Sequence, residues 1–219
     1  PAGSLIAGQK HTMPRTVGRI LYHAVSKTGV IYVVQERDTR ALYFGQGPLQ
    51  SRISIATPHQ PVLGYVQAMT AFLLFRTQCP TVLQLGLGAG SLWHHFPTAR
   101  IEVVEHDLLV AELAHRFFFL PRDERLHVHI NDAAVFVTEP TAGPEHYALL
   151  TVDAFDAAGL AHGMDALVFF DACRTRLLND GILVINLWQD TAGDFARIAQ
   201  HIDTVFDQQT LHLPVEGKG

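Results

Sequence analysis

Residues 82–92 read VLQLGLGAGSL, and residues 101–107 read IEVVEHD. The first stretch has the form of a buried strand, a glycine-rich turn and the start of a helix, and the second is a strand that ends in acids. Glu105 follows Gly86, the first glycine of the turn, by roughly 20 residues, the spacing at which an acid can accept hydrogen bonds from the two hydroxyls of a ribose. Together the two stretches predict a nucleoside site on an α/β sheet.

The glycines form a G-x-G-x-G pattern, with Gly86, Gly88 and Gly90 as the expected ligand-binding positions. The dinucleotide fingerprint G-x-G-x-x-G instead places a pyrophosphate on a helix N-terminus. G-x-G-x-G with a downstream acid is the usual form in sites of the S-adenosylmethionine type, whose ligand has no phosphate, and we favour that ligand over a dinucleotide. A tight strand–helix turn without a ligand is the remaining alternative.

Composition narrows the function classes. The 219 residues are enough for one full α/β domain with a small addition, and 48% of them are apolar. The net charge of −5 gives no electrostatic reason to expect a nucleic acid partner. No apolar run reaches the roughly 18 residues of a membrane span, and Cys79 and Cys173 have no motif spacing. We therefore expect a cytoplasmic protein with reduced thiols and no membrane partner.

The chain divides into two expected domains. Runs of β-branched and aromatic residues before position 55 predict a small antiparallel sheet, and residues 1–57 are the expected N-terminal β-strand domain. Alternating strands and helices follow, so residues 58–219 are expected to form a doubly wound, mostly parallel Rossmann-like domain that binds the nucleoside and carries the catalytic residues.

The expected elements have the following bounds. In the first domain, strands are expected at 19–23, 30–35 and 40–44, and the second domain is expected to begin with a helix after Pro61. In the second domain, strands are expected at 81–85, 101–105, 126–130, 147–153, 182–187 and 208–213, and helices at 90–95, 108–117, 132–137, 165–178 and 191–205. Met13 could be a start, and the sequence stops where a seventh strand would begin, so we expect a shortened chain.

Carboxylates follow two of the predicted parallel strands, at the edge where open α/β sheets bind ligands. Asp132 can accept from an adenine amine, and it can also cap the next helix. The buried run at 148–152 would deliver Asp153 to the sheet edge, with Asp156 shortly after it. Ordinary loop positions are the alternative for both aspartates. The chain has thirteen histidines, and a few of them are close in the sequence, such as His94 and His95. No third ligand is evident beside them, so we expect no metal site.

These residues together resemble the spermidine synthase family, the polyamine aminopropyltransferases, over residues 18–190. The resemblance lies in RALYFG at 40–45, Gln50 with Ser51, Tyr65, the glycines at 86–90, the strand end at 104–107, NDA at 131–133 and DAFD at 153–156. It implies a methyltransferase-like nucleotide domain after a small β domain, a decarboxylated S-adenosylmethionine co-substrate and a homodimer.

The resemblance also implies a role for individual residues. Asp153 would help to deprotonate the amine that attacks the aminopropyl carbon, with Asp156 as its companion. The implied binding residues are Glu105 for the ribose, Asp132 for the adenine, Gln50 on the ligand side, and Tyr65 and Gln67 toward the substrate.

Four positions depart from the family pattern. Ala89 stands where the family has an aspartate, and Val66 replaces a polar residue. Ala157 follows Asp156 where the family has a proline, and Asn186 follows the fifth strand where the family usually has a glutamine. These departures favour the spermidine-synthase-like branch. They leave open aminopropyl transfer to an amine such as putrescine, S-adenosylmethionine-dependent methyl transfer, and nucleoside binding without catalysis.

Overall fold

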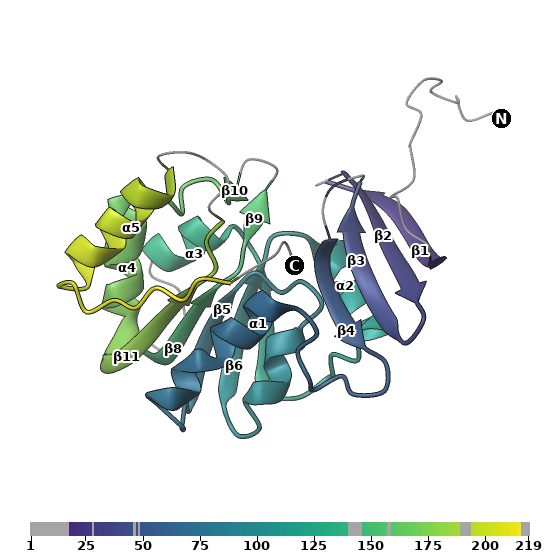
Figure 1. Cartoon of the computed structure of the whole chain (residues 1–219), viewed down its shortest axis with the longest axis horizontal. Helices are drawn as coiled ribbons and strands as arrows, with labels where there is room; N and C mark the ends of the chain where they lie inside the picture. The colour runs from purple at the N-terminus through teal and green to yellow at the C-terminus, as the bar shows by residue number, and fades with distance from the viewer. Residues whose placement is uncertain are drawn as a thin grey trace.

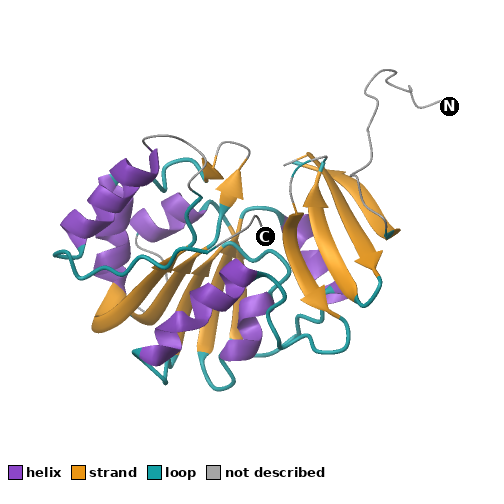
Figure 2. Cartoon of the chain, in the orientation of Figure 1, coloured by secondary structure: helices purple, strands orange, loops and turns teal. Residues whose placement is uncertain are grey.

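The structure, a computed structural model, describes residues 18–27, 29–45, 47, 49–139, 146–156, 159–188 and 194–215. It contains a four-stranded antiparallel sheet next to a five-stranded parallel sheet that has helices on both faces (Figures 1 and 2). The predicted fold class is therefore confirmed. A further two-stranded sheet, of β9 (Phe155–Asp156) and β10 (Gly159–Leu160), follows the fourth parallel strand.

The antiparallel sheet is a meander with the order β1-β2-β3-β4. Its strands are β1 (Arg19–Ser26), β2 (Gly29–Glu36), β3 (Thr39–Phe44) and β4 (Leu49–Ser54). Only the first three were predicted. The sheet shares an apolar cluster with helix α2: Ile31 and Leu42 from the strands pack with Val110, Leu113 and Phe118.

The parallel sheet has the order β11-β8-β5-β6-β7. Its strands are β5 (Thr81–Leu85), β6 (Arg100–Glu105), β7 (Leu126–Ile130), β8 (Tyr147–Val152) and β11 (Leu177–Ile185). The helices are α1 (Gly64–Met69), η1 (Thr70–Leu74), η2 (Ser91–His95), α2 (Leu108–Phe117), α3 (Ala133–Thr138), α4 (Leu167–Arg176) and α5 (Asp194–Val205). Because the chain moves from β5 to β6 and β7 and then crosses back to β8, the order reverses at β5, where sheets of this kind bind their ligands.

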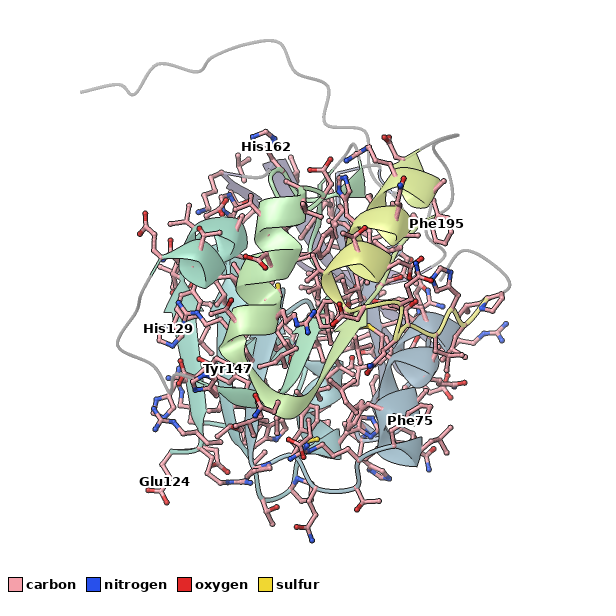
Figure 3. All side chains as sticks on the ribbon, turned by 90° about the vertical axis from the view of Figure 1, so that its left-hand side faces the viewer. Phe75, Glu124, His129, Tyr147, His162 and Phe195 are labelled. Carbon is pink, nitrogen blue, oxygen red and sulfur yellow. The ribbon has the colours of Figure 1, made fainter. Side chains whose placement is uncertain are left out.

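Successive residues of each parallel strand enter different cores, as the period of two requires. Val82 and Leu149 pack with α1, η1 and η2, whereas Leu83 and Leu150 pack with α3, α4 and α5. Figure 3 shows the side chains that fill the space between these helices and the sheet, with Tyr147 inside it. A sheet that is buried on both faces explains why its strands read as nearly continuous apolar runs.

Two expected elements differ from the structure. The predicted strand at 208–213 is wrong, because residues 209–215 have no regular secondary structure and run back toward α1, where Val215 lies beside Gly64 (Figure 1). The predicted helix at 165–178 is too long. Helix α4 ends at Arg176, and β11 starts at once with Leu177, which pairs with Tyr147 before a register shift. Within the described residues, no helix is long and apolar enough to cross a membrane.

Candidate functional site

The glycine loop, residues 86–90, follows β5 at the point where the strand order reverses. Gly86 has a φ of +90°, which L side chains rarely adopt. A Cβ atom on Gly86 would lie 2.2 Å from the backbone oxygen of Asp153. The first glycine is therefore required by the close approach of the loop to the end of β8.

Glu105, at the end of β6, is bound to the glycine loop. Its Oε2 atom accepts from the backbone N–H of Leu87 at 3.1 Å, and its Oε1 atom accepts from that of Asp107 at 2.9 Å. Burial raises the pKa of the Glu105 carboxyl, and these backbone donors oppose that shift. Because each carboxylate oxygen can accept more than one hydrogen bond, the arrangement is compatible with a ribose diol.

Asp132 has the capping role that the sequence offered as one interpretation. Its Oδ1 atom accepts from the backbone N–H of Val135 at 2.9 Å, at the start of α3, and the residue is exposed. Asp132 follows β7, so it lies at the carboxyl ends of the parallel strands, as Glu105 does. The contact of Asp132 with an adenine stays a prediction.

Asp153, directly after β8, is part of a hydrogen-bond network. Its Oδ1 atom accepts from the side-chain amide of Asn186 at 3.0 Å, and its carboxyl also bonds to the hydroxyl of Tyr65. The same hydroxyl lies 3.3 Å from the backbone oxygen of Gln50, on β4. Burial raises the pKa of Asp153, while Asn186 and Tyr65 oppose the shift by stabilising the charged form. The network joins both sheets around one carboxyl group.

Asn186 was known from the sequence only as a departure from the family pattern. Its backbone N–H donates to the oxygen of Val152 at 2.9 Å, which continues the pairing of β11 with β8 and brings its side chain to Asp153. The signal for this contact was the position of Asn186 directly after β11, the next strand of the parallel sheet after β8 in the sequence.

Tyr65 and Gln67, the two residues expected near the substrate, point in different directions from α1. Tyr65 reaches Asp153, whereas Gln67 is exposed and its Nε2 atom donates to the backbone oxygen of Pro61 at 2.9 Å. Residues two apart on a helix point in different directions, which explains the divergence. Val66, between them, is buried in the core of the parallel sheet.

Ala89, within the glycine loop, packs against the antiparallel sheet. It is 1% exposed and packs in the cluster that contains Ile31 and Val110. Its backbone N–H donates to the Oγ atom of Ser51 at 3.1 Å. The antiparallel sheet therefore holds the glycine loop in place from one side.

Two aromatic side chains stack next to Asp153. The rings of Phe155 and Trp188 have centroids 4.5 Å apart and planes inclined by 14°. Asp156 follows Phe155 in β9, and its side chain lies outside the described part of the structure, so its role stays a prediction.

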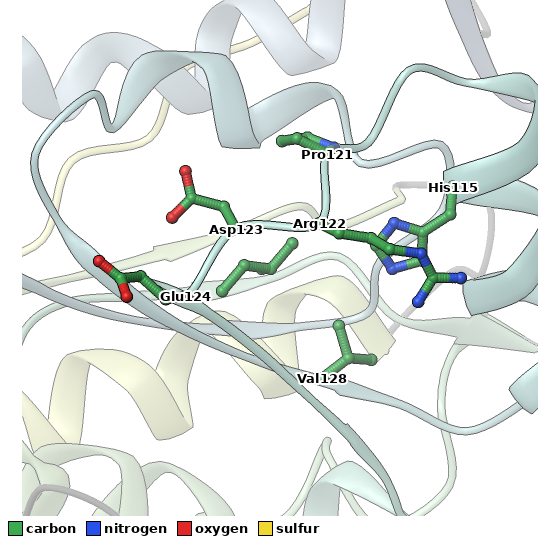
Figure 4. A pocket seen from close by; sticks show the side chains of 7 residues that line it. His115, Pro121, Arg122, Asp123, Glu124 and Val128 are labelled. Carbon is green, nitrogen blue, oxygen red and sulfur yellow. The ribbon is translucent and has the colours of Figure 1, made fainter.

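A separate pocket lies away from this site, between the end of α2 and the start of β7 (Figure 4). It is lined by His115, Pro121, Arg122, Asp123, Glu124, Leu126 and Val128. The pocket is near the amino end of β7, whereas the glycine loop, Glu105 and Asp153 are at the carboxyl ends of their strands.

Among the described residues, no group of three or more His, Cys, Asp or Glu side chains could hold a metal ion.

Comparison with known sequences gives relatives of two kinds, some that match most of the chain and some that match about half of it. The chain is 32% identical, over 218 residues, to the polyamine aminopropyltransferase of Neisseria meningitidis serogroup A, a match that covers 94% of this chain and 80% of that one. It is 33% identical, over 119 residues, to the mouse eEF1A lysine and N-terminal methyltransferase, covering 49% of this chain and 17% of that one. No family model matches the chain.

Solved structures share the fold. A probable spermidine synthase from Corynebacterium glutamicum has a TM-score of 0.65 and 22% identity, over 78% of this chain and 64% of that one. Human methyltransferase-like protein 13, in complex with SAH, has a TM-score of 0.62 and 23% identity, over 71% of this chain and 78% of that one. At these identities the two structures show the fold alone.

Proposed function

The chain belongs to the polyamine aminopropyltransferase family and is a transferase, and from this premise we propose that it moves an aminopropyl group from decarboxylated S-adenosylmethionine to an amine such as putrescine. The observation that supports this most is the position of Asp153. Asp153 directly follows β8, its backbone lies against the glycine loop, and β8 is on the opposite side of β5 from β6, which ends in Glu105. A nucleoside and an amine could therefore meet between the two acids.

In this proposal the nucleoside lies over the ends of β5 and β6. Glu105 accepts from the ribose hydroxyls, Asp132 accepts from the adenine amine, and Gln50 contributes from β4. The alternating glycines let the donor approach the backbone closely. The ribose contact is supported by the fixed orientation of the Glu105 carboxyl, which two backbone N–H groups hold.

The reaction needs a base for the amine. The amine nitrogen forms a bond to the aminopropyl carbon next to the sulfonium, the carbon–sulfur bond breaks, and the sulfur keeps the electron pair as a neutral thioether. The proton lost by the nitrogen passes to Asp153, whose charged form Asn186 and Tyr65 stabilise. Asp156 is proposed to bind the acceptor.

Methyl transfer from intact S-adenosylmethionine is the second candidate. The specific observation in its favour is Ala89, because a carboxylate at that position would repel the carboxylate of the intact donor. The relationship to the mouse methyltransferase over half the chain also favours it. The same residues would serve this reaction, with a different carbon of the sulfonium attacked.

One experiment separates these functions. The purified protein is incubated with each donor and a panel of amines that includes putrescine, and the thioether product is identified by mass spectrometry. Methylthioadenosine with an aminopropylated amine supports the first proposal, and S-adenosylhomocysteine with a methylated amine supports the second. If neither donor turns over but both bind in calorimetry, the chain is a nucleoside binder without catalysis.

Two further proposals concern the cell and the assembly. We propose that the enzyme is cytoplasmic, and the free thiols of Cys79 and Cys173 are consistent with that compartment. We also expect a homodimer. Light scattering coupled to size-exclusion chromatography tests the dimer, and a monomer at micromolar concentration would contradict it.

A further inference from the structure

The segments that follow β8 and β11 form two side-chain pairs, at the same residue offset as the last strand pair, Ile185 with Val152. The first pair is Asp153 with Asn186, joined by the 3.0 Å hydrogen bond. The second is Phe155 with Trp188, two residues further along each segment, with ring centroids 4.5 Å apart. The residues between them, Ala154 and Leu187, pack against the core under α4 and α5. Because extended segments alternate their side chains, the carboxyl–amide pair and the aromatic pair share the side that faces away from this core.

The sheet order places Asp153 and Asn186 on the acceptor side of the site, and Phe155 and Trp188 follow them two residues further along each segment. The proposed nucleoside ligand Glu105 ends β6, on one side of β5, whereas β8 and β11 lie on the other side. An amine that reaches Asp153 opposite the nucleoside therefore comes from the direction of the aromatic pair. Trp188 is 40% exposed, which leaves ring surface for a ligand.

We propose that Phe155 and Trp188 receive the apolar body of the amine acceptor, so that the enzyme selects amines with an extended alkyl or aryl segment. The inference rests on the proposed function, since it assigns the acceptor to this side of Asp153. The two groups that would recognise such a molecule lie two residues apart on each segment: a carboxylate for the ammonium head and an aromatic surface for the carbon chain. The stacked rings also fix each other, so the surface has little conformational freedom to lose on binding.

The chemistry of the pair predicts how affinity changes with the acceptor. Each methylene group that moves from water onto the rings strengthens binding by up to about fourfold. A series of linear primary amines of increasing length should therefore show a steady fall in KM with the wild-type enzyme. A site lined only by polar groups would give no such trend.

The test measures KM across this amine series for the wild type and for Trp188→Ala, Trp188→Phe and Phe155→Ala. We expect the dependence on chain length to be largely lost in both alanine variants and mostly kept in Trp188→Phe. Phe75→Ala is the matched control, since Phe75 is another exposed aromatic residue, 69% exposed after η1, and has no role in the proposed site (Figure 3). It should keep the wild-type trend.

A second readout separates this inference from the proposed function. Tryptophan fluorescence follows amine binding to the protein with methylthioadenosine present, without any need for turnover; Trp93, the other tryptophan, is buried. If binding tightens with chain length in the wild type but no amine reacts, the acceptor surface stands and the proposed reaction fails. If short amines react but neither KM nor binding depends on chain length, or if Trp188→Ala keeps the wild-type dependence, the inference is overturned.

Discussion

The Oε2 atom of Glu105 accepts a hydrogen bond from the backbone N–H of Leu87, so the acid at the end of β6 and the loop after β5 form one bonded unit. The glycine loop and Glu105 thus depend on each other for their geometry. A change at either one should alter both the position of the loop and the affinity for a nucleoside.

Replacement of Glu105 by alanine tests the ribose contact. We expect Glu105→Ala to weaken binding of methylthioadenosine by roughly 1.5–3 kcal/mol, the range for a hydrogen bond to a charged group. Isothermal titration calorimetry measures this directly. Glu124→Ala is the control, because Glu124 is an exposed acid at the remote pocket and should leave the affinity unchanged (Figure 4). Equal affinities in wild type and Glu105→Ala would remove Glu105 from the site.

Replacement of Asp153 by asparagine tests the proposed base. Asp153→Asn keeps the shape and the acceptor for Asn186 but removes the negative charge. Turnover should fall by about 10²–10⁴, the usual contribution of a general base, while nucleoside affinity changes little. Steady-state kinetics with the best amine, together with calorimetry, separates the two effects. Full activity in the variant would exclude Asp153 as the base.

The same substitution should stabilise the fold at neutral pH. Burial raises the pKa of Asp153 in the folded state above its unfolded value, so the charged form is disfavoured by folding. That cost is absent below the unfolded pKa of about 3.9, where both states are protonated, and is complete above the folded pKa. The melting temperature of Asp153→Asn should therefore exceed that of the wild type at pH 8, with a gain that shrinks toward pH 4. A gain independent of pH would show that ionisation is not its cause.

Removal of the first glycine should damage the fold as well as the site. Gly86→Ala places a methyl group against the backbone oxygen of Asp153, which cannot move as a side chain can. Gly29→Ala is the matched control: Gly29 also has a positive φ, +114°, but nothing lies within 4 Å of its added Cβ. Denaturant unfolding should show a loss of about 1–2 kcal/mol for the control, from backbone strain alone, and a clearly larger loss for Gly86→Ala. Equal losses would mean that the close approach is not required.

An aspartate at position 89 should change both stability and donor preference. Ala89→Asp introduces a carboxylate among apolar residues such as Ile31 and Val110, so the melting temperature should fall. Added decarboxylated donor should then raise that temperature more than intact S-adenosylmethionine does, because only its ammonium lacks a neighbouring carboxylate. Thermal shift assays with both donors measure this, with Ala89→Ser as the uncharged control. Equal shifts from the two donors would contradict the role of position 89.

Most strands of the parallel sheet could be predicted from local patterns. The strand that was missed and the strand that was wrongly predicted have one cause, which is that strand formation depends on pairing. The bounds expected for the first and third parallel strands, 81–85 and 126–130, are those of β5 and β7, since buried apolar runs between turn residues identify such strands. The strand β4 (Leu49–Ser54) reads LQSRIS, a polar sequence whose strand conformation comes from pairing with β3. The segment at 208–213 is the reverse case, because an alternating pattern forms no strand unless a neighbouring strand pairs with it.

The candidate site could be predicted where one segment contains the whole signal. The glycine loop and Glu105 lie in adjacent strands of one βαβ-like unit, and their spacing is visible in the sequence. The contacts of Asn186 with Asp153 and of Ser51 with Ala89 join residues more than 30 positions apart, and no local pattern encodes them. These two contacts depend on the packing of complete elements.

The apolar cluster between the meander and α2 makes the two sheets one cooperative unit. Ile31 and Leu42 cover Val110, Leu113 and Phe118, so a local opening that frees the meander must also uncover one side of α2 and the support of the glycine loop. In native-state hydrogen exchange, the amides of β2, α2 and the loop should therefore share one opening free energy. A nucleoside bound more than one element away would then slow exchange in the meander, and we expect that the parallel sheet could not be transplanted without it.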